Sequence, residues 1–275
     1  MAMRVGHLYI VGFNRTDPET LEVCEGLYRK YAGRTGAAAK IWAAGGDKIE
    51  VEAAAGPILL NPGLKPGRID GVQAPTGQFK QRFEAGAYIV VHGIGDAVLD
   101  DVLSVTPQVV AEVLQAVIPK ADHGKLAKVA LIQCFAASKP FKAKLTSLPE
   151  PPKLDDLEAA TGMKIEDAGY AVRLVAALHR VGMRPMVVGW DEYVSVAPHA
   201  PSQEKVLIPP EKMGGKNWGR VEDLNAIRGA KIVHDPKGYS LVRANYREKH
   251  KHVYCADAEG RVRFDFAGWS DKANS

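Results

Sequence analysis

Cysteine is scarce in this sequence: Cys24, Cys134 and Cys255 are the only three among 275 residues. Thiols that are so few and so far apart do not make a disulfide framework or a cysteine-rich zinc site. We therefore expect three reduced cysteines in a protein made in a cytosol.

Long apolar runs are missing as well. No stretch approaches the roughly 20 apolar residues that cross a bilayer. The start, MAMRVGHLYIVGFN, lacks the basic segment and the small-residue cleavage site of a signal peptide. We therefore expect neither a membrane span nor a secretory leader.

A strong charge of either sign is also lacking, because the formal net charge is only +4. This excludes a strongly acidic chain and gives no argument for a nucleic-acid partner. The sequence contains no G-x-S-x-G, as serine hydrolases have, and no H-E-x-x-H, as zinc peptidases have. We predict no metal site.

What the sequence does contain is an alternation of apolar runs and helical patterns, which predicts an α/β fold. Near-continuous apolar runs such as GAYIVV are typical of strands buried on both faces of a parallel sheet. The predicted strands are His7–Phe13, Lys40–Ala44, Lys48–Ala54, Gly86–Val91, Lys128–Ile132 and Pro185–Val188; the predicted helices run from Asp17 to about Tyr31 and over Pro107–Ile118 and Ile165–Val181; residues 56–85 and Lys139–Lys153 are predicted loops.

The last third changes character, with a helical stretch near Val221–Ile227 among short alternating strands. These strands are predicted at Lys231–His234, Ser240–Asn245, His252–Ala256 and Val262–Phe266. We expect one contiguous domain over residues 1–275, with an α/β core over 1–200 and an antiparallel, basic appendix over 201–275.

Two of the predicted buried strands end at residues that can carry out catalysis. His92 follows the run IVV, and Cys134 follows ALIQ. Catalytic groups collect at the carboxyl ends of parallel strands, so we expect these two side chains at one edge of the sheet. A thiolate that attacks and an imidazole that takes its proton form a nucleophilic pair.

Gly93 directly follows His92 and has no Cβ, so a substrate carbonyl can approach its backbone N–H. We expect the N–H groups of Gly93 and Cys134 to stabilise an oxyanion. A lone cysteine at a strand end is more often a small buried apolar residue. Here the strand ends, the single intervening helix and the glycine coincide, and this favours the catalytic interpretation.

Three segments carry a resemblance to a known family: YIVVHGIGD followed by VALIQC, GGDKIEVEA, and HDPKGYSLVRAN. They resemble the caspase-like clan (clan CD) of cysteine peptidases, and more specifically the autoprocessing cysteine protease domains of clostridial glucosylating toxins and MARTX toxins. The resemblance implies a caspase-like, mostly parallel central sheet flanked by helices, with a C-terminal antiparallel β-flap. It also implies a cysteine endopeptidase that acts as a bacterial toxin or effector, or that processes its own chain.

By the same resemblance, Asp47 would orient His92, since a carboxylate on one ring nitrogen fixes the tautomer and stabilises the imidazolium. The alternative is that Asp47 is only the turn residue of a Gly-Gly-Asp hairpin. Asp70 and Asp96 are the reserve candidates for the third catalytic position.

Inositol hexakisphosphate activates the domains that this chain resembles, through a basic surface, while the chemistry itself needs no cofactor. The basic residues that would bind such a polyphosphate here are Lys237, Arg243, Lys249 and Lys251. A solvated basic face is the alternative.

The expected partner is a protein substrate, either a host protein or the chain itself, and the resemblance implies synthesis in a bacterial cytoplasm with delivery to a host-cell cytosol. Asp191 or Glu192 could pair with a basic substrate residue, or both could be plain strand-end acids. The exposed-looking segment KAKLTSLPEPPKL is a candidate self-cleavage site. Two other functions stay open: a cysteine-dependent acyltransferase or transamidase, and a catalytically silent module that senses a polyanion.

Overall fold

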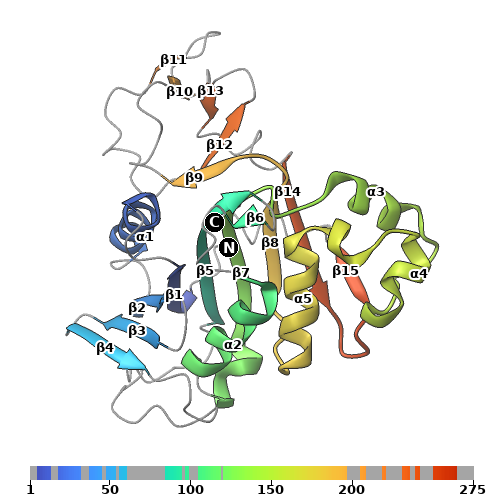
Figure 1. Ribbon diagram of the computed structural model, residues 1–275, viewed down its shortest axis with the longest axis horizontal. Coiled ribbons are helices and arrows are strands. Elements are labelled where there is room, and N and C mark those ends of the chain that lie inside the picture. Colours follow the sequence, from blue (N-terminus) through green and yellow to red (C-terminus); the bar gives the residue numbers. More distant parts are fainter. Residues whose placement is uncertain are drawn as a thin grey trace.

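The protein has an α/β fold, in which a mixed β-sheet packs against several helices (Figure 1). The computed structural model describes residues 5–13, 18–31, 37–44, 48–53, 56–60, 84–94, 97–98, 105–118, 120–196, 205–208, 219–220, 231–235, 239–241 and 250–264. None of the helices within these ranges combines the length and the apolar character needed to cross a membrane.

The large sheet has ten strands in the order β15-β14-β8-β7-β5-β1-β2-β3-β4, with β6 paired to β5. Its centre, from β2 to β8, is parallel, whereas its two ends are antiparallel. The strands are β1 (Val5–Phe13), β2 (Ala37–Ala44), β3 (Lys48–Ala53), β4 (Gly56–Leu60), β5 (Glu84–Ile94), β6 (Ala97–Val98), β7 (Leu126–Cys134), β8 (Met186–Trp190), β14 (Lys251–Ala256) and β15 (Val262–Phe264).

A second sheet of five strands has the order β11-β10-β13-β12-β9. These strands are β9 (Val194–Val196), β10 (Lys205–Ile208), β11 (Gly219–Arg220), β12 (Lys231–Asp235) and β13 (Tyr239–Leu241). The helices are α1 (Pro18–Tyr31), α2 (Pro107–Val117), α3 (Lys139–Ser147), α4 (Leu157–Thr161) and α5 (Tyr170–Arg180), with the 3₁₀ helices η1 (Lys120–Lys125), η2 (Leu154–Asp156) and η3 (Ile165–Ala168).

Side chains that alternate along the strands build two separate cores, one on each face of the large sheet. In β7, Val129 and Leu131 join the core that α2 and α5 cover. Ala130 and Ile132 join the opposite core, which α1 covers. Because both faces are covered, the middle of β7, Val129–Ile132, is a continuous apolar run that is buried throughout, as its sequence predicts.

The predicted loop over Lys139–Lys153 is wrong in its first part, because Lys139–Ser147 forms helix α3. The Ser138 side chain caps the helix by accepting from the N–H of Phe141 at 3.3 Å, and Pro140 suits the first turn. Phe141 and Leu145 lie one helical turn apart and are both buried. The candidate self-cleavage segment therefore begins in a packed helix, which does not fit the exposed loop expected there.

The predicted helix over Ile165–Val181 is also wrong in its first turn. Residues Ile165–Ala168 form η3, and α5 begins only after Gly169. Gly169 has φ 86° and ψ 157°, a conformation that is essentially restricted to glycine and that interrupts the helix. A third correction concerns the predicted loop over 56–85, because Gly56–Leu60 forms β4 and pairs with β3.

The two sheets do not divide the chain at residue 200. Strand β9 comes before this point but belongs to the small sheet, whereas β14 and β15 come after it and extend the large one. Figure 1 shows β14 running beside β8. The expected helix near Val221–Ile227 lies outside the described residues, and the expectation of a single domain stays a prediction.

The two glycines Gly169 and Gly162 provide a matched test of this packing. A Cβ at Gly169 would lie 3.0 Å from the backbone nitrogen of Ser138, whereas a Cβ at Gly162, with φ 67°, would meet nothing within 4 Å. We expect Gly169→Ala to lower the free energy of unfolding by about 3 kcal/mol or more, since strain and a clash add up. Gly162→Ala should cost only about 1–2 kcal/mol. Urea unfolding of both variants checks this, and equal midpoints would contradict it.

Candidate active site

Cys134 is the last residue of β7, at the carboxyl end of a strand in the parallel part of the sheet. Its side chain is only partly buried, and the thiol lies 3.8 Å from the carbonyl oxygen of Val194, to which it can donate. The backbone at this point therefore brings a thiol to the surface next to the start of β9.

His92 and Gly93 lie near the carboxyl end of β5, which is the parallel neighbour of β7. Ile94 pairs with Cys134, and the register shifts between Val90 and Ile94, so the His-Gly pair lies in the irregular part of this strand. Both strands thus end at the same edge of the sheet, as expected. The side chain of His92 is outside the description, and so are Asp47, Asp70 and Asp96.

The backbone bends sharply directly after Cys134. Phe135 has φ 51°, and it is the one residue other than glycine with a positive φ in the described parts of the chain. This left-handed conformation costs about 1–2 kcal/mol, so the surroundings must enforce it. They do so through two hydrogen bonds: the N–H of Phe135 donates to the Glu192 carbonyl at 3.3 Å, and that of Ala137 donates to the Trp190 carbonyl at 3.0 Å.

These hydrogen bonds clamp the turn after Cys134 onto the end of β8. An edge-to-face contact between the rings of Phe135 and Tyr193, with centroids 4.7 Å apart, adds to the clamp. Because the Phe135 N–H is already used, it is not available to an oxyanion. The predicted oxyanion donors therefore remain the N–H groups of Gly93 and Cys134.

A cavity of about 340 Å³ is lined in part by the residues that follow Cys134 in the sequence. Its walls come from the turn after β7, the start of α3, the η3–α5 junction and the end of β8. The lining residues are Phe135, Ala137, Ser138, Lys139, Pro140, Glu166, Asp167, Gly169, Tyr170 and Asp191. The cavity is large enough for a small ligand, but Cys134 itself is not among its lining residues.

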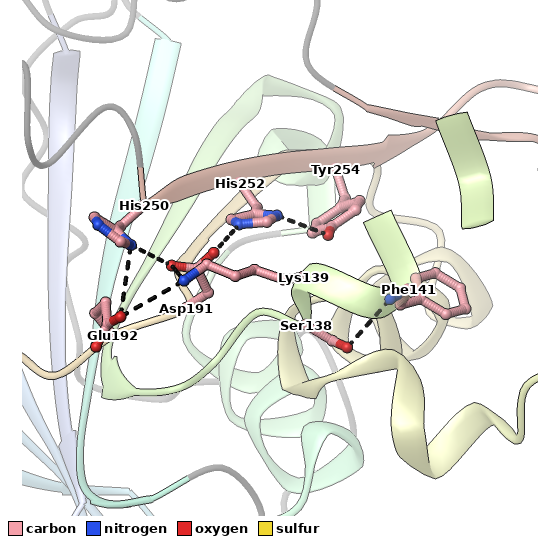
Figure 2. A network of polar contacts seen from close by, with 8 residues as sticks. All are labelled: Ser138, Lys139, Phe141, Asp191, Glu192, His250, His252 and Tyr254. Carbon is pink, nitrogen blue, oxygen red and sulfur yellow. Dashed lines mark hydrogen bonds and ion pairs between the residues drawn. The ribbon is translucent and has the colours of Figure 1, made fainter. Parts of the chain in front are cut away.

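Asp191 lies at the centre of a polar network at the end of β8 (Figure 2). One carboxylate oxygen of this buried residue accepts from Nδ1 of His250 at 2.7 Å, and the other accepts from Nε2 of His252 at 2.6 Å. On the far side of His252, its Nδ1 faces the Tyr254 hydroxyl at 3.3 Å. The second ring nitrogen of His252 therefore has a partner as well.

Burial of the Asp191 carboxyl opposes its charged form, but the hydrogen bonds from His252 and His250 and the charges of His252 and Lys139 outweigh this. The net result is that the pKa of Asp191 is lowered from its ordinary value. Asp191 is therefore a carboxylate at neutral pH. It joins β8 to the residues that begin β14.

Lys139 extends from the start of α3 to this network. Its ammonium lies 3.6 Å from Asp191 Oδ1 and 3.5 Å from Glu192 Oε1, while 56% of its side chain is exposed. Asp191, Glu192 and His250 could also hold a metal ion, because one ligand atom of each lies within 4.8 Å of the others. The Lys139 ammonium already supplies a positive charge to the two carboxylates.

The other two cysteines have different settings. Cys24 lies in α1 and is completely buried. Burial raises the pKa of Cys255 in β14, with Arg263 opposing the increase and Asp257 adding to it. A raised pKa means less thiolate at neutral pH, so Cys255 is a poor nucleophile. All three cysteines are thiols and none forms a disulfide.

The expected polyphosphate residues Lys237, Arg243 and Lys249 lie outside the described residues. Lys251 is the first residue of β14, where it pairs with Trp190 and is only 7% exposed. This burial does not fit the exposed basic face that was expected for Lys251. The polyphosphate site as a whole stays a prediction.

The histidines that hold Asp191 were not singled out from the sequence. Their spacing, with His250 and His252 two residues apart, places both on one side of an extended strand and offers a signal. The sequence alone suggests Asp191 only as a strand-end acid or as a partner for a basic substrate residue. Its pairing with two histidines about 60 residues later depends on the β8–β14 register, which the sequence pattern does not reveal.

Comparison of the sequence with models of known protein families and with curated proteins finds no match.

Because the pKa of Asp191 is lowered, we predict that its contribution to stability depends on pH. We expect Asp191→Asn to reduce the free energy of unfolding by about 3 kcal/mol at neutral pH, because it removes one partner from a buried charged network. A carboxyl with a lowered pKa in the folded state stabilises fully above the unfolded pKa of about 3.9 and loses this effect as pH falls through the folded pKa. The difference between wild type and variant should therefore shrink at acid pH.

Urea unfolding at a series of pH values measures this difference. Asp155→Asn is the matched control, since this exposed residue of η2 should change stability by no more than about 0.5 kcal/mol. A loss of stability in Asp191→Asn that stays the same down to the lowest pH would speak against a charged Asp191.

Proposed function

We propose that the protein is a cysteine endopeptidase of caspase-like architecture, with Cys134 as the nucleophile, His92 as the general base and Gly93 as an oxyanion donor. The observation that carries the proposal is the placement of Cys134: a partly exposed thiol at the carboxyl end of a parallel strand, with the His-Gly pair on the neighbouring strand. Parallel strands present catalytic groups at this edge.

The chemistry follows from these groups. The imidazole of His92 takes the proton of the Cys134 thiol, and the thiolate attacks the carbonyl carbon of the scissile peptide bond. The oxyanion that forms accepts from the N–H groups of Gly93 and Cys134. When the carbon–nitrogen bond breaks, the imidazolium returns its proton to the leaving amine. Water then hydrolyses the thioester, with His92 again accepting a proton, and the free thiol is restored.

One further feature supports a peptidase. The strained backbone at Phe135 is of the kind that clusters at functional sites, and here it directly follows the proposed nucleophile. The substrate would be a protein, from a host cell or the chain itself, as for a bacterial toxin or effector.

Covalent labelling tests this assignment directly. We expect peptidyl chloromethyl ketones ending in Lys, Leu or Asp to modify Cys134, because Cys24 is fully buried and burial raises the pKa of Cys255. Mass spectrometry of the digested protein locates the adduct. Labelling with and without inositol hexakisphosphate shows in addition whether the polyanion activates the thiol.

Cys134→Ala is the control, and it should abolish labelling by every ketone. An adduct on Cys24 or Cys255 with none on Cys134, in the presence and in the absence of the polyanion, would rule out Cys134 as the nucleophile.

Replacement of the proposed base makes a second test. We expect His92→Ala to lower kcat/KM for peptide cleavage by about 100-fold to 10,000-fold, the usual contribution of general acid–base catalysis. Added imidazole should restore part of the rate, which a purely structural defect would not allow. Unchanged cleavage by a folded His92→Ala protein would remove His92 from the mechanism.

A further inference from the structure

The last residue of β8, Trp190, buries a hydrogen-bond donor that has no acceptor. Its side chain is only 2% exposed. Among the residues that the structure describes, no atom accepts a hydrogen bond from the Nε1–H of this indole. A buried donor without an acceptor destabilises the folded state, so native structures keep few of them and each one calls for an explanation.

Trp190 and the Cys134 thiol lie on the same face of the large sheet. Side chains alternate along a strand, and in β8 both Val188 and Trp190 belong to the core that α1 covers. In β7, Ile132 belongs to this same core, so the alternation places Cys134, two residues later, on that face as well. Because β7 and β8 are parallel neighbours, both residues lie at the same edge of the sheet.

Val194 connects the indole with the thiol. It packs in the same core as Trp190, while its carbonyl oxygen lies 3.8 Å from the Cys134 sulfur. The backbone adds a second connection, because the N–H of Ala137 donates to the Trp190 carbonyl at 3.0 Å and so holds the turn after Cys134 against β8. The end of β8 and the thiol are therefore held close together on this face.

Loss of the thiol proton changes which partner suits the Cys134 sulfur. The neutral thiol can donate to the Val194 carbonyl oxygen. A thiolate has no proton to donate, and the negative end of the carbonyl dipole repels it. Because Cys134 is partly buried, its charged form also loses part of the hydration that stabilises it in water. The thiolate therefore needs a hydrogen-bond donor on this face.

We propose that the Trp190 Nε1–H donates to the Cys134 thiolate, after rotation about the Cα–Cβ bond of Cys134 has carried the sulfur away from the Val194 carbonyl. The inference rests on the proposed function, in which the thiol proton passes to His92. The indole N–H is only a donor, so it gains a partner when the thiolate forms. Trp190 therefore stabilises the reactive form of the cysteine more than its resting form.

Alkylation of the full-length protein by iodoacetamide over a range of pH tests this inference, because the thiolate is the form that reacts. Mass spectrometry of the peptide that contains Cys134 gives the rate. In Trp190→Phe, which lacks the donor, the pH of half-maximal alkylation should rise by about one unit. The rate at neutral pH should fall about 10-fold.

A second variant separates the lost donor from lost volume, because phenylalanine is smaller than tryptophan and leaves a cavity. Replacement of Trp190 by benzothienylalanine keeps a side chain of two fused rings and exchanges the N–H for a sulfur. We expect the same rise in the pH of half-maximal alkylation. Urea unfolding should show a stability equal to or above that of the wild type, since no donor is then buried without an acceptor.

Tyr170→Phe is the matched control. The Tyr170 hydroxyl is also a buried donor, but it has an acceptor, the Val105 carbonyl at 2.8 Å, and it belongs to the core on the other face of the sheet. Its removal should lower stability and leave the pH profile of Cys134 alkylation unchanged.

The outcomes separate this inference from the proposed function. If Cys134 reacts and the benzothienylalanine variant keeps the wild-type pH profile, Trp190 does not stabilise the thiolate, although the peptidase assignment stands. If the profile moves to higher pH in this variant but not in Tyr170→Phe, the inference is supported. If Cys134 of the wild type resists alkylation with and without inositol hexakisphosphate, the proposed function fails, and the inference fails with it.

Discussion

The buried carboxylate of Asp191 is the interaction on which the candidate site depends. It joins the end of β8 to His250 and His252, at the beginning of β14, through hydrogen bonds of 2.7 and 2.6 Å. The end of β8 in turn holds the turn after Cys134, because the Trp190 and Glu192 carbonyls accept from that turn. A largely buried charge that is satisfied from two sides thus fixes the backbone next to the thiol.

Much of the fold follows from the sequence, because apolar runs report burial on both faces. The runs before His92 and Cys134 are strands β5 and β7, and the helix predicted at Pro107–Ile118 is α2 within one residue. The wrong predictions have physical causes. The sequence predicts a loop at the start of α3, because a proline and lysines are concentrated there. The structure instead has a helix, which the Ser138 side chain caps and whose first turn accommodates Pro140.

The site was less predictable than the strands. Strand ends are local features, so Cys134 and His92 could be placed at the carboxyl ends of parallel strands from pattern alone. The partners of Asp191 and the walls of the cavity come from residues that are about 20 to 60 positions apart and are brought together by the order of the strands. Periodicity carries no information about such contacts. Asp47 and the basic residues Lys237, Arg243 and Lys249 stay predictions.

The surroundings of Cys134 depend on strand β14, which lies far away from it in the sequence. Residues after 250 complete the large sheet beside β8, on the side opposite to β7. A chain shortened to its first 200 residues would keep the thiol and the His-Gly pair but would expose the edge of β8 and leave Asp191 without either histidine. The part of the sequence that reads as an appendix is therefore a structural element of the large sheet, and the surroundings of the Cys134 thiol are complete only after residues 250–252 have been synthesised.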